Sequence, residues 1–337
     1  MRRFALRIGM LALTVMFAAA GSEARAQTKV RLAVGGQSAL YYLPLTITDR
    51  LGYFKDEGLA VEISDLQGGS KALQALIGGS ADVVAGAFDH TIQMQAKNQP
   101  ITAVVQLGRY PGFVLAVVAS KAASYRSPRD LKGMKIGITA PGSSTHFMAR
   151  YLLARNGLKE DDAAFIGIGT GQTAVAAVKR GEIDALINAD PVISTLESEG
   201  LIKVVLDTRT AEGTRQVYGG AYPAAVLYAT PAYVLGYPKT VQGLTNALVR
   251  GLRWIAANSP EQIADLMPPE YALGNRAVYV RAIRASIPMY SPDGMIEREA
   301  AEIAHKVLMQ FDPDVQKANI DLTATYSNGF VAKVPPR

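Results

Sequence analysis

Apolar and polar positions follow two different patterns along the chain. Short runs rich in β-branched residues predict buried strands, and these runs cover residues 29–34, 60–64, 82–85, 101–107, 113–119, 134–139, 164–168, 183–187, 202–206 and 225–229. Elsewhere apolar residues recur every three or four positions, which predicts helices over residues 70–77, 173–180, 260–266, 276–287 and 296–311. Strands that alternate with helices are typical of an α/β fold, with a mainly parallel sheet covered by helices on both faces.

The strands fall into two sets, and the rest of the chain is helical. After residue 229 the apolar positions Val241, Leu244, Leu248, Leu252 and Ile255 follow the period of one buried helix face. One arrangement explains both features: the chain starts in lobe one, crosses to build lobe two, and returns. We therefore predict lobe one from residues 27–114 and 225–337 and lobe two from residues 115–224. The apolar runs 113–119 and 225–229 would be paired hinge crossings, with a ligand bound between the lobes.

The turn that follows the predicted strand 134–139 has the features of an anion site. Pro141 and Gly142 break the strand, and three hydroxyl residues then open a helix. Free backbone N–H groups and the helix dipole favour a negative charge at such a helix start. The predicted contacts are Gly142, Ser143, Ser144 and Thr145. The alternative is that these residues only cap the helix.

Turns after the other strands supply further candidates, because ligands collect beyond the carboxyl ends of parallel strands. Tyr41 and Tyr42 could line a cleft or pack in the core, and Arg109 could grip an oxyanion or serve the structure. Asp89 and Asp190 could contact a ligand or cap the helices that follow them. The full set of candidates outside the anion turn is Gln37, Ser38, Tyr41, Tyr42, Phe88, Asp89, Arg109, Asn188, Asp190 and Tyr222.

The N-terminal 26 residues differ in character from the rest. Arg2, Arg3 and Arg7 precede the apolar run 8–20, and Ala24-Arg25-Ala26 supplies a small-x-small cleavage pattern. The run is too short for a comfortable membrane crossing. We therefore interpret residues 1–26 as a signal peptide cleaved before Gln27, rather than as a membrane anchor.

Charge and cysteine content exclude several classes of protein. The formal net charge of the 337 residues is +6, and it falls to +3 (31 basic and 28 acidic residues) when residues 1–26 are removed. No cluster of basic residues is interleaved with aromatic ones, so nucleic acid is not an expected partner. The chain has no cysteine, which excludes disulfides, thiolate metal sites, a cysteine nucleophile and a lipoprotein anchor.

Several motifs in this order and spacing resemble the substrate-binding proteins of ABC transporters, in the group that binds sulfonates, taurine, nitrate and thiamine precursors. The motifs are Leu43-Pro44, Gly52-Tyr53-Phe54-Lys55-Asp56-Glu57-Gly58-Leu59, Ala72-Leu73, Gly78-Gly79-Ser80-Ala81-Asp82-Val83, Asp130-Leu131-Lys132-Gly133-Met134-Lys135-Ile136-Gly137, Gly142-Ser143-Ser144, Gly181-Glu182-Ile183-Asp184-Ala185 and Asp190-Pro191. The resemblance covers nearly the whole mature chain. It implies the type II periplasmic binding protein fold, whose two lobes close on a ligand and present it to a membrane permease.

The expected function is therefore capture of a small solute in the periplasm by a monomer, without a metal or cofactor. Gly142 to Thr145 and Arg109 suit an anionic head group, such as a sulfonate or carboxylate, and the aromatic candidates suit an aromatic or alkyl body. A thiamine-precursor-type pyrimidine is the alternative, with Asp89 or Asp190 taking its amino group. An exported ligand sensor would need the same cleft.

An enzyme is the third class of function, because a pyrimidine-synthesising family shares this fold. The chain has three histidines, His90, His146 and His305, and only the first two fall in predicted cleft turns. Neither is part of a hydrolase or zinc motif. We therefore expect no enzymatic activity, while contact of His90 or His146 with the ligand stays open.

Overall fold

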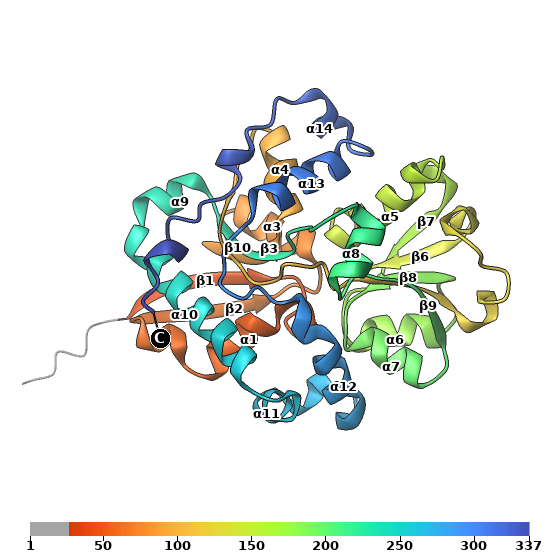
Figure 1. Ribbon diagram of the computed structural model, residues 1–337, viewed down its shortest axis with the longest axis horizontal. Coiled ribbons are helices and arrows are strands. Elements are labelled where there is room, and N and C mark those ends of the chain that lie inside the picture. The colour runs from red at the N-terminus through yellow and green to blue at the C-terminus, as the bar shows by residue number, and fades with distance from the viewer. Residues whose placement is uncertain (1–26, 337) are drawn as a thin grey trace, which may run out of the picture.

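Two five-stranded sheets, each with its own helices, lie side by side in the computed structural model (Figure 1). The structure describes residues 27–336, so the predicted signal peptide lies outside the described residues. We call the part built on the first sheet lobe one and the part built on the second lobe two. The α/β architecture expected from the apolar runs is confirmed.

Lobe one carries a sheet of order β2-β1-β3-β10-β4. The strand β1 pairs in parallel with β2 and β3, whereas β10 runs antiparallel between β3 and β4. All five residues of β3 and of β10 are buried, as their continuous apolar sequences require. The strands are β1 (Thr28–Val34), β2 (Leu59–Asp65), β3 (Val83–Ala87), β4 (Thr102–Gln106) and β10 (Ala225–Ala229).

Lobe two carries a sheet of order β7-β6-β8-β5-β9. Here β6 is parallel to β7 and β8, and β5 runs antiparallel between β8 and β9. The two sheets therefore share one plan, with a single antiparallel strand inserted next to the parallel ones. The strands are β5 (Val114–Val118), β6 (Lys135–Ile138), β7 (Ala164–Gly167), β8 (Ala185–Asn188) and β9 (Ile202–Asp207).

Helices cover both sheets and also join the lobes. In lobe one α3 and α4 pack on β3, and α10 packs on β2 and β4; in lobe two α5 packs on β6 and β8. The C-terminal helices α12 and α13 reach α7 and α5 of the other lobe. The helices are α1 (Leu43–Arg50), α2 (Tyr53–Asp56), α3 (Gly69–Ile77), α4 (Asp89–Ala96), α5 (Ser144–Arg155), α6 (Gln172–Lys179), α7 (Val192–Ser198), α8 (Ala211–Tyr218), α9 (Pro231–Gly236), α10 (Pro238–Ala257), α11 (Pro260–Leu266), α12 (Arg276–Ser286), α13 (Arg298–Leu308) and α14 (Pro313–Lys317).

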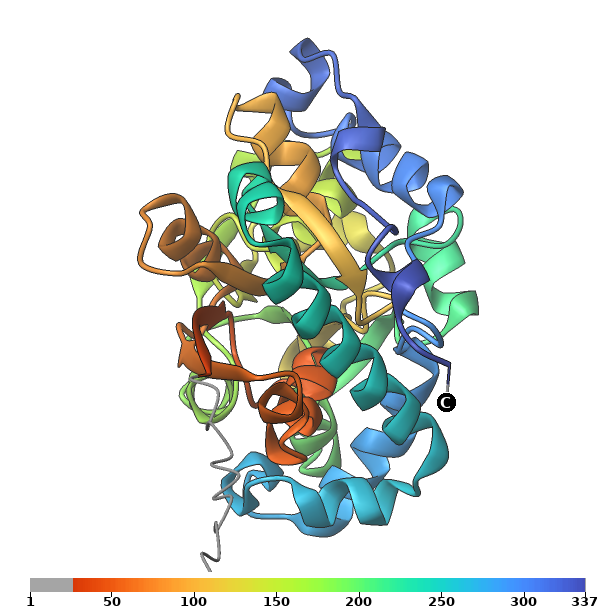
Figure 2. The same ribbon diagram turned by 90° about the vertical axis from the view of Figure 1, so that its left-hand side faces the viewer.

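The long helix α10 confirms the apolar period seen in the sequence. Its first residue is Pro238, which suits the start of a helix because its missing N–H is not needed there. Figure 2 shows it running diagonally across lobe one. The predicted face is buried, namely Val241, Leu244, Leu248, Leu252 and Ile255.

The chain passes between the lobes twice, and the two crossings are hydrogen-bonded to each other. The N–H groups of Leu107 and Gly108 donate to the carbonyl of Ala225 at 2.7 and 3.0 Å, and Ala224 N–H donates to the carbonyl of Gly108 at 2.9 Å. The hinge predicted within the runs 113–119 and 225–229 therefore needs correction. These runs form β5 and β10, which lie in different sheets, because strands so apolar are buried between neighbours rather than exposed in a crossing.

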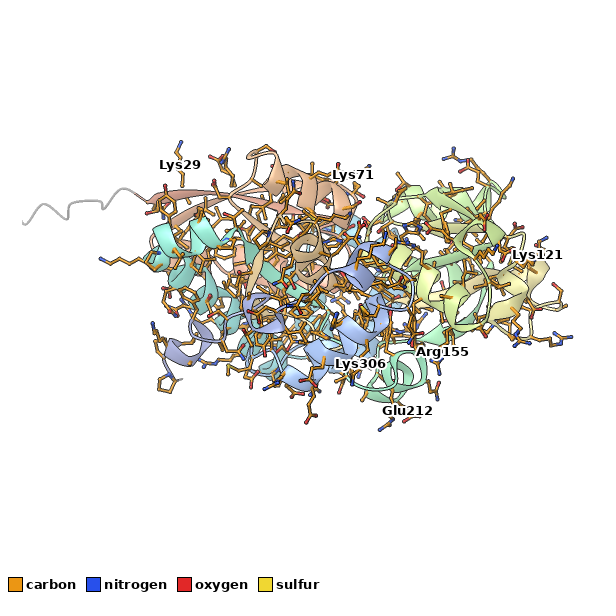
Figure 3. The ribbon with its side chains drawn as sticks, turned by 90° about the horizontal axis from the view of Figure 1, so that it is seen from above. Lys29, Lys71, Lys121, Arg155, Glu212 and Lys306 are labelled. Carbon is orange, nitrogen blue, oxygen red and sulfur yellow. The ribbon has the colours of Figure 1, made fainter. Side chains whose placement is uncertain are left out.

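The surface is that of a folded domain with its charges outside. Charged side chains including Lys29, Lys71, Lys121 and Lys306 are exposed and project from the two lobes (Figure 3). Within residues 27–336, no helix combines the length and apolar character needed to cross a membrane.

Candidate ligand-binding site between the two lobes

The start of α5 forms the wall that lobe two contributes to the site. The buried strand β6 ends at Ile138, and Gly142 has a φ of 80°, a conformation that glycine adopts without strain. Thr139 N–H donates to Thr145 Oγ1 at 3.0 Å, and Gly142 N–H donates to His146 Nδ1 at 3.1 Å. Among the described residues, no acceptor is recorded for the N–H groups of Ser144 and Thr145. These are the orphan donors expected in the first turn of a helix.

The start of α4 forms the opposite wall in lobe one, where two buried titratable groups follow β3. Ser144 Oγ donates to Asp89 Oδ1 at 2.6 Å, and Tyr222 OH donates to Asp89 Oδ2 at 3.3 Å. His90 Nε2 lies 3.2 Å from the carbonyl of Gly142, and His90 Nδ1 lies 3.4 Å from Tyr228 OH. Both residues therefore bond across the boundary between the lobes.

Further hydrogen bonds join the lobes around the same point. Ser70 N–H donates to Ser143 Oγ at 3.0 Å, and Ser143 Oγ donates to Ser70 Oγ at 3.2 Å. Thr170 Oγ1 donates to Gln67 Oε1 at 2.8 Å. The N–H of Leu40 donates to the carbonyl of Asp190 at 2.7 Å. The described arrangement is thus a closed one, with side chains of both lobes in direct contact.

A small cavity lies between these walls. It offers about 30 Å³ to the centres of water-sized atoms, which is room for only one or two waters. On one side Tyr41 stacks on Phe113, with ring centroids 4.9 Å apart, and meets Tyr42 edge-on at 4.7 Å. The other lining residues are small or polar: Gly35, Ala39, Gly69, Ala87, His90, Thr139, Ser143, Ser144, Thr145, Thr170, Asn188 and Ala189.

Burial determines the charge of the groups at the cavity. Desolvation raises the pKa of the Asp89 carboxyl and the pKa values of the Tyr41, Tyr42 and Tyr222 hydroxyls. Desolvation also lowers the pKa of His90. The tyrosines and His90 are therefore neutral near pH 7. Within residues 27–336, no lysine or arginine lines the cavity.

A second buried acid, Asp190, lies in the loop that follows β8. Asp190 Oδ1 accepts from Ser194 N–H at 2.8 Å, and Asp190 Oδ2 lies 2.8 Å from Arg209 Nη1. Arg209 also contacts Asp207 at 2.6 Å. Although desolvation opposes the charge of Arg209, its hydrogen bonds and charge interactions with Asp207 and Asp190 raise its pKa further. Asp190 therefore anchors the loop and does not itself line the cavity.

The structure places nine of the fourteen residues predicted for the site at the cavity or behind it. Six line the cavity: Tyr41, Tyr42, Ser143, Ser144, Thr145 and Asn188. Three more lie behind it through hydrogen bonds: Asp89 is bonded to Ser144, Tyr222 is bonded to Asp89, and Gly142 is bonded to His90.

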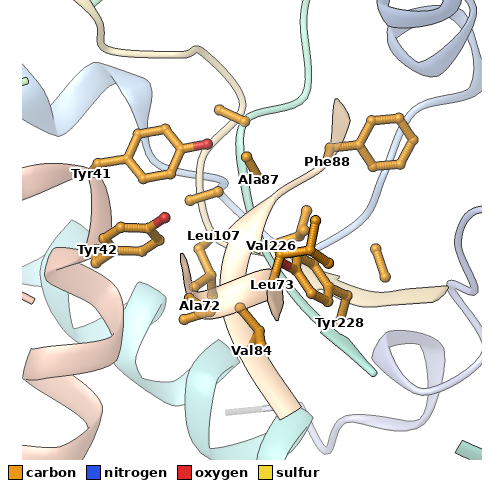
Figure 4. Packing of buried hydrophobic residues seen from close by; sticks show 14 of the residues in the cluster. Tyr41, Tyr42, Ala72, Leu73, Val84, Ala87, Phe88, Leu107, Val226 and Tyr228 are labelled. Carbon is orange, nitrogen blue, oxygen red and sulfur yellow. The ribbon is translucent and has the colours of Figure 1, made fainter. Parts of the chain in front are cut away.

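The other predicted residues lie elsewhere for identifiable reasons. The Phe88 ring points away from Tyr41 and Tyr42 into the core of lobe one, where it meets Tyr326 (Figure 4). Arg109 is exposed, and its Nε donates to the carbonyl of Pro288 at 3.2 Å. Gln37 and Ser38 are partly exposed and do not line the cavity, and the N–H of Gln37 donates to Asp65 Oδ2 at 3.0 Å.

Several cavity residues had no distinctive sequence signal. Phe113 begins the apolar run 113–119, which also predicts an ordinary core strand, Thr139 ends the run 134–139, and Ala87 lies in the turn that follows the run 82–85. Thr170 is different, because it lies in the glycine-rich turn 169–171 at a helix start, a pattern that could have identified it. His146 does not line the cavity; it packs edge-on against Phe165, with ring centroids 4.5 Å apart. No cluster of three metal-ligating side chains occurs within residues 27–336.

Known proteins resemble this chain over most of its length. A solved structure of a protein from Bordetella bronchiseptica RB50 is 47% identical, has a TM-score of 0.88, and is matched over 91% of this chain and 97% of that one. The alkanesulfonate-binding protein SsuA from Xanthomonas axonopodis pv. citri, solved with bound MOPS, is 18% identical with a TM-score of 0.69, covering 89% of this chain and 99% of that one. This second likeness shows the type II periplasmic binding protein fold.

Curated relatives include an enzyme. The 4-amino-5-hydroxymethyl-2-methylpyrimidine phosphate synthase of Aspergillus parasiticus is 26% identical over 267 residues, which are 75% of each chain. The family described as NMT1/THI5 like matches residues 40–263, more than half of the sequence. The chain therefore belongs to the NMT1/THI5-like family.

Proposed function

We propose that this protein is the solute-binding component of an ABC import system. It captures a small organic molecule between its lobes and delivers it to a membrane permease. The observation that carries the proposal is the cavity at the lobe boundary, which is walled by the helix starts of α4 and α5 and bridged by side chains of both lobes. A fold shared with the alkanesulfonate-binding protein SsuA supports the same function.

The cavity is too small for most organic solutes, so we propose that the lobes open to admit the ligand. Residues 115–224 would rotate against residues 27–114 and 225–337 about the paired crossings at Gly108 and Ala224–Ala225. Closure would then exclude water and renew the contacts Ser70–Ser143 and Asp89–Ser144. Residues 1–26 would direct export of the chain to the periplasm, where the mature protein would act as a monomer.

An enzymatic role finds less support in the geometry, although the Aspergillus parasiticus relative carries an enzyme name. A hydroxyl nucleophile needs a base within hydrogen-bonding distance. Ser143 donates to the hydroxyl of Ser70, and Ser144 donates to the carboxyl of Asp89. His90 is engaged by the carbonyl of Gly142 and by Tyr228. No nucleophile–base pair is therefore formed by these serines and His90.

The two classes of ligand that the sequence suggested remain candidates for this site. An organic sulfonate or carboxylate is supported by the two free N–H groups at the start of α5, but Arg109, its second expected contact, lies outside the cavity. A thiamine-precursor-type pyrimidine is supported by the aromatic wall of Tyr41 and Phe113 and by Asp89. An exported sensor would use the same cleft, and neighbouring genes for a permease and an ATPase, rather than for a sensor kinase, would favour import.

A combined binding and closure assay tests the proposal. The mature chain is screened for a rise in melting temperature against sulfonates, carboxylates, nitrate, pyrimidines and amines. Each hit is then tested for lobe closure by fluorescence transfer between labels at Lys29→Cys and Lys121→Cys. These labels are specific because the chain has no native cysteine. A ligand that raises the melting temperature and brings the labels closer supports the proposal; hits that leave the label distance unchanged contradict it.

A further inference from the structure

Three hydroxyl groups on the polar wall of the cavity have already committed their protons, whereas Thr139 and Thr145 share one hydrogen bond at 2.9 Å that leaves one proton of the pair available. The proton of Ser144 goes to Asp89, and that of Ser143 goes to Ser70. The proton of Thr170 goes to Gln67 Oε1. A hydroxyl has one proton and two lone pairs. The oxygens of these three side chains can therefore act toward a ligand only as hydrogen-bond acceptors.

Both ring nitrogens of His90 are likewise already engaged in hydrogen bonds. A carbonyl oxygen only accepts, so the contact with Gly142 requires the proton on Nε2. Nδ1 of the neutral ring then accepts from Tyr228 OH. The ring has no proton left for a ligand. Asn188 is also engaged on both sides, since its Nδ2 donates to the carbonyl of Gly169 and its Oδ1 accepts from Ala189 N–H.

The acidic groups around the cavity also favour a ligand that donates hydrogen bonds. Asp89 is 2% exposed and lies one hydrogen bond behind the wall at Ser144. Its carboxyl group lies beside the first turn of α5, where it accepts from the Ser144 hydroxyl at 2.6 Å. Asp190 and Asp207 share the single cation Arg209, so this group also carries a net negative charge.

Positive groups near the cavity are weak by comparison. Lys71 lines an outer hollow that shares Thr139 with the cavity, but its side chain is exposed, and solvent and salt screen such a charge. The N–H groups of Ser144 and Thr145 remain available, and they suit a neutral acceptor atom once Asp89 compensates the helix dipole.

We infer that the cavity selects a flat ligand that donates several N–H hydrogen bonds, such as an amidine or another protonated nitrogen base, and rejects the carboxylate of the same shape. This inference rests on the proposed function, and it names the chemistry of that same site. The stacked pair Tyr41 and Phe113 supplies the flat, electron-rich face that such a cation prefers. Asp89 accepts the proton of Ser144, so the serine oxygen is left to accept a hydrogen bond from the ligand.

Probes matched in shape test this inference. Acetamidine and acetate, and benzamidine and benzoate, are titrated calorimetrically into the mature protein and into two variants. Asp89→Asn removes the negative charge and leaves one carboxamide oxygen for the two hydroxyls, of Ser144 and Tyr222, that Asp89 accepts from. Lys71→Gln is the matched control, because it changes one charge on the outer surface. The melting temperature of each variant verifies folding.

The expected result is that the wild-type protein binds each amidine at least about tenfold more tightly than its carboxylate partner, as a charge-assisted hydrogen bond requires. Asp89→Asn should reduce that ratio by at least about tenfold, and Lys71→Gln should leave it within about twofold. Equal or tighter binding of the carboxylates overturns the inference. An unchanged ratio in folded Asp89→Asn also overturns it, as does a lack of amidine binding at about 10 mM.

The outcomes for the two proposals can be separated. If a sulfonate or carboxylate from the wider screen closes the lobes while the amidines do not bind, the inference fails and the proposed function stands. If no solute closes the lobes, the proposed function itself fails.

Discussion

Arg209 and Asp190 form a buried ion pair with 2.8 Å between Nη1 and Oδ2, and their side chains are only 12% and 1% exposed. Replacement of Arg209 with glutamine should destabilise the fold by about 3–5 kcal/mol, because it leaves the carboxylate of Asp190 buried without a cation. Urea denaturation of the mature protein measures the loss.

The matched control for Arg209 is Arg284, which pairs with Glu261 at 2.7 Å on the exposed surface of lobe one. Arg284→Gln should change the free energy of unfolding by less than about 1 kcal/mol. If the two variants lose similar stability, the Asp190–Arg209 pair does not have the structural role described here.

The serine contact between the lobes should favour the closed form. Ser143→Ala removes both hydrogen bonds to Ser70, so the balance should shift toward the open form by about 1–2 kcal/mol. Fluorescence transfer between labels at positions 29 and 121 should fall. In the control Ser80→Ala, the lost hydroxyl bonds only Ala75 within lobe one, and the transfer should stay at the wild-type value. Equal fluorescence transfer in both variants would contradict the expectation that the Ser70–Ser143 contact favours the closed form.

The buried carboxyl of Asp89 should lower the stability of the folded protein near pH 7. Burial raises the pKa of its carboxyl above the ordinary 3.8, so ionisation in the folded state is unfavourable. This penalty is absent below pH 3.8 and grows as the pH rises through the higher pKa of the folded state. Asp89→Asn should therefore melt a few degrees above the wild-type protein near pH 7, with the gap closing toward pH 4. A variant that melts lower at neutral pH would show that the hydrogen bonds from Ser144 and Tyr222 outweigh desolvation.

His146 should make the protein sensitive to acid. Desolvation and the charge of Arg150 lower its pKa from 6.5 to about 4, and Glu160, 3.6 Å from Nε2, is half exposed and compensates little. The unfolded chain binds a proton below pH 6.5 and the folded chain does not, so stability is lost as the pH falls from 6.5 toward 4.

The variant His146→Asn tests this effect while keeping an acceptor for the N–H of Gly142. Relative to the wild-type protein, it should gain about 1–2 kcal/mol of unfolding free energy between about pH 7 and pH 5. Parallel denaturation curves at the two pH values provide the measurement. Equal pH slopes in both proteins would assign the acid sensitivity to other groups.

The fold was largely predictable because each lobe repeats a strong local pattern. The run 225–229 is a strand with the predicted bounds, and the helix face of α10 is buried as its period requires. A short apolar run does not reveal its partners, however. The pairing of β10 with β3 and β4, and the place of the hinge, depend on contacts distant in sequence. The helix α2 is only four residues long, which is too short to show an apolar period in the sequence.

The site was less predictable, because neighbours in sequence face different ways. Phe88 and Asp89 adjoin each other, yet the first packs in the core and the second reaches lobe two. Arg109 follows a strand as an anion-binding arginine would, but a backbone carbonyl at Pro288 holds it outside the cavity. Hydroxyl and backbone groups at helix starts could be identified from turn chemistry, whereas the orientation of each side chain depends on the opposite lobe.

The insertion of β10 between β3 and β4 has a consequence for folding order. Residues 114–207 contain all five strands of the sheet in lobe two, so this lobe can assemble from one continuous stretch. The sheet of lobe one keeps a gap between β3 and β4 until residues 225–229 return, and its closure therefore needs the contacts of longest range, which form slowly. Pulsed hydrogen exchange during refolding should show protection in β6 and β8 before β4. Lobe two, which the middle of the chain forms, would then fold before lobe one, which the two ends of the chain form together.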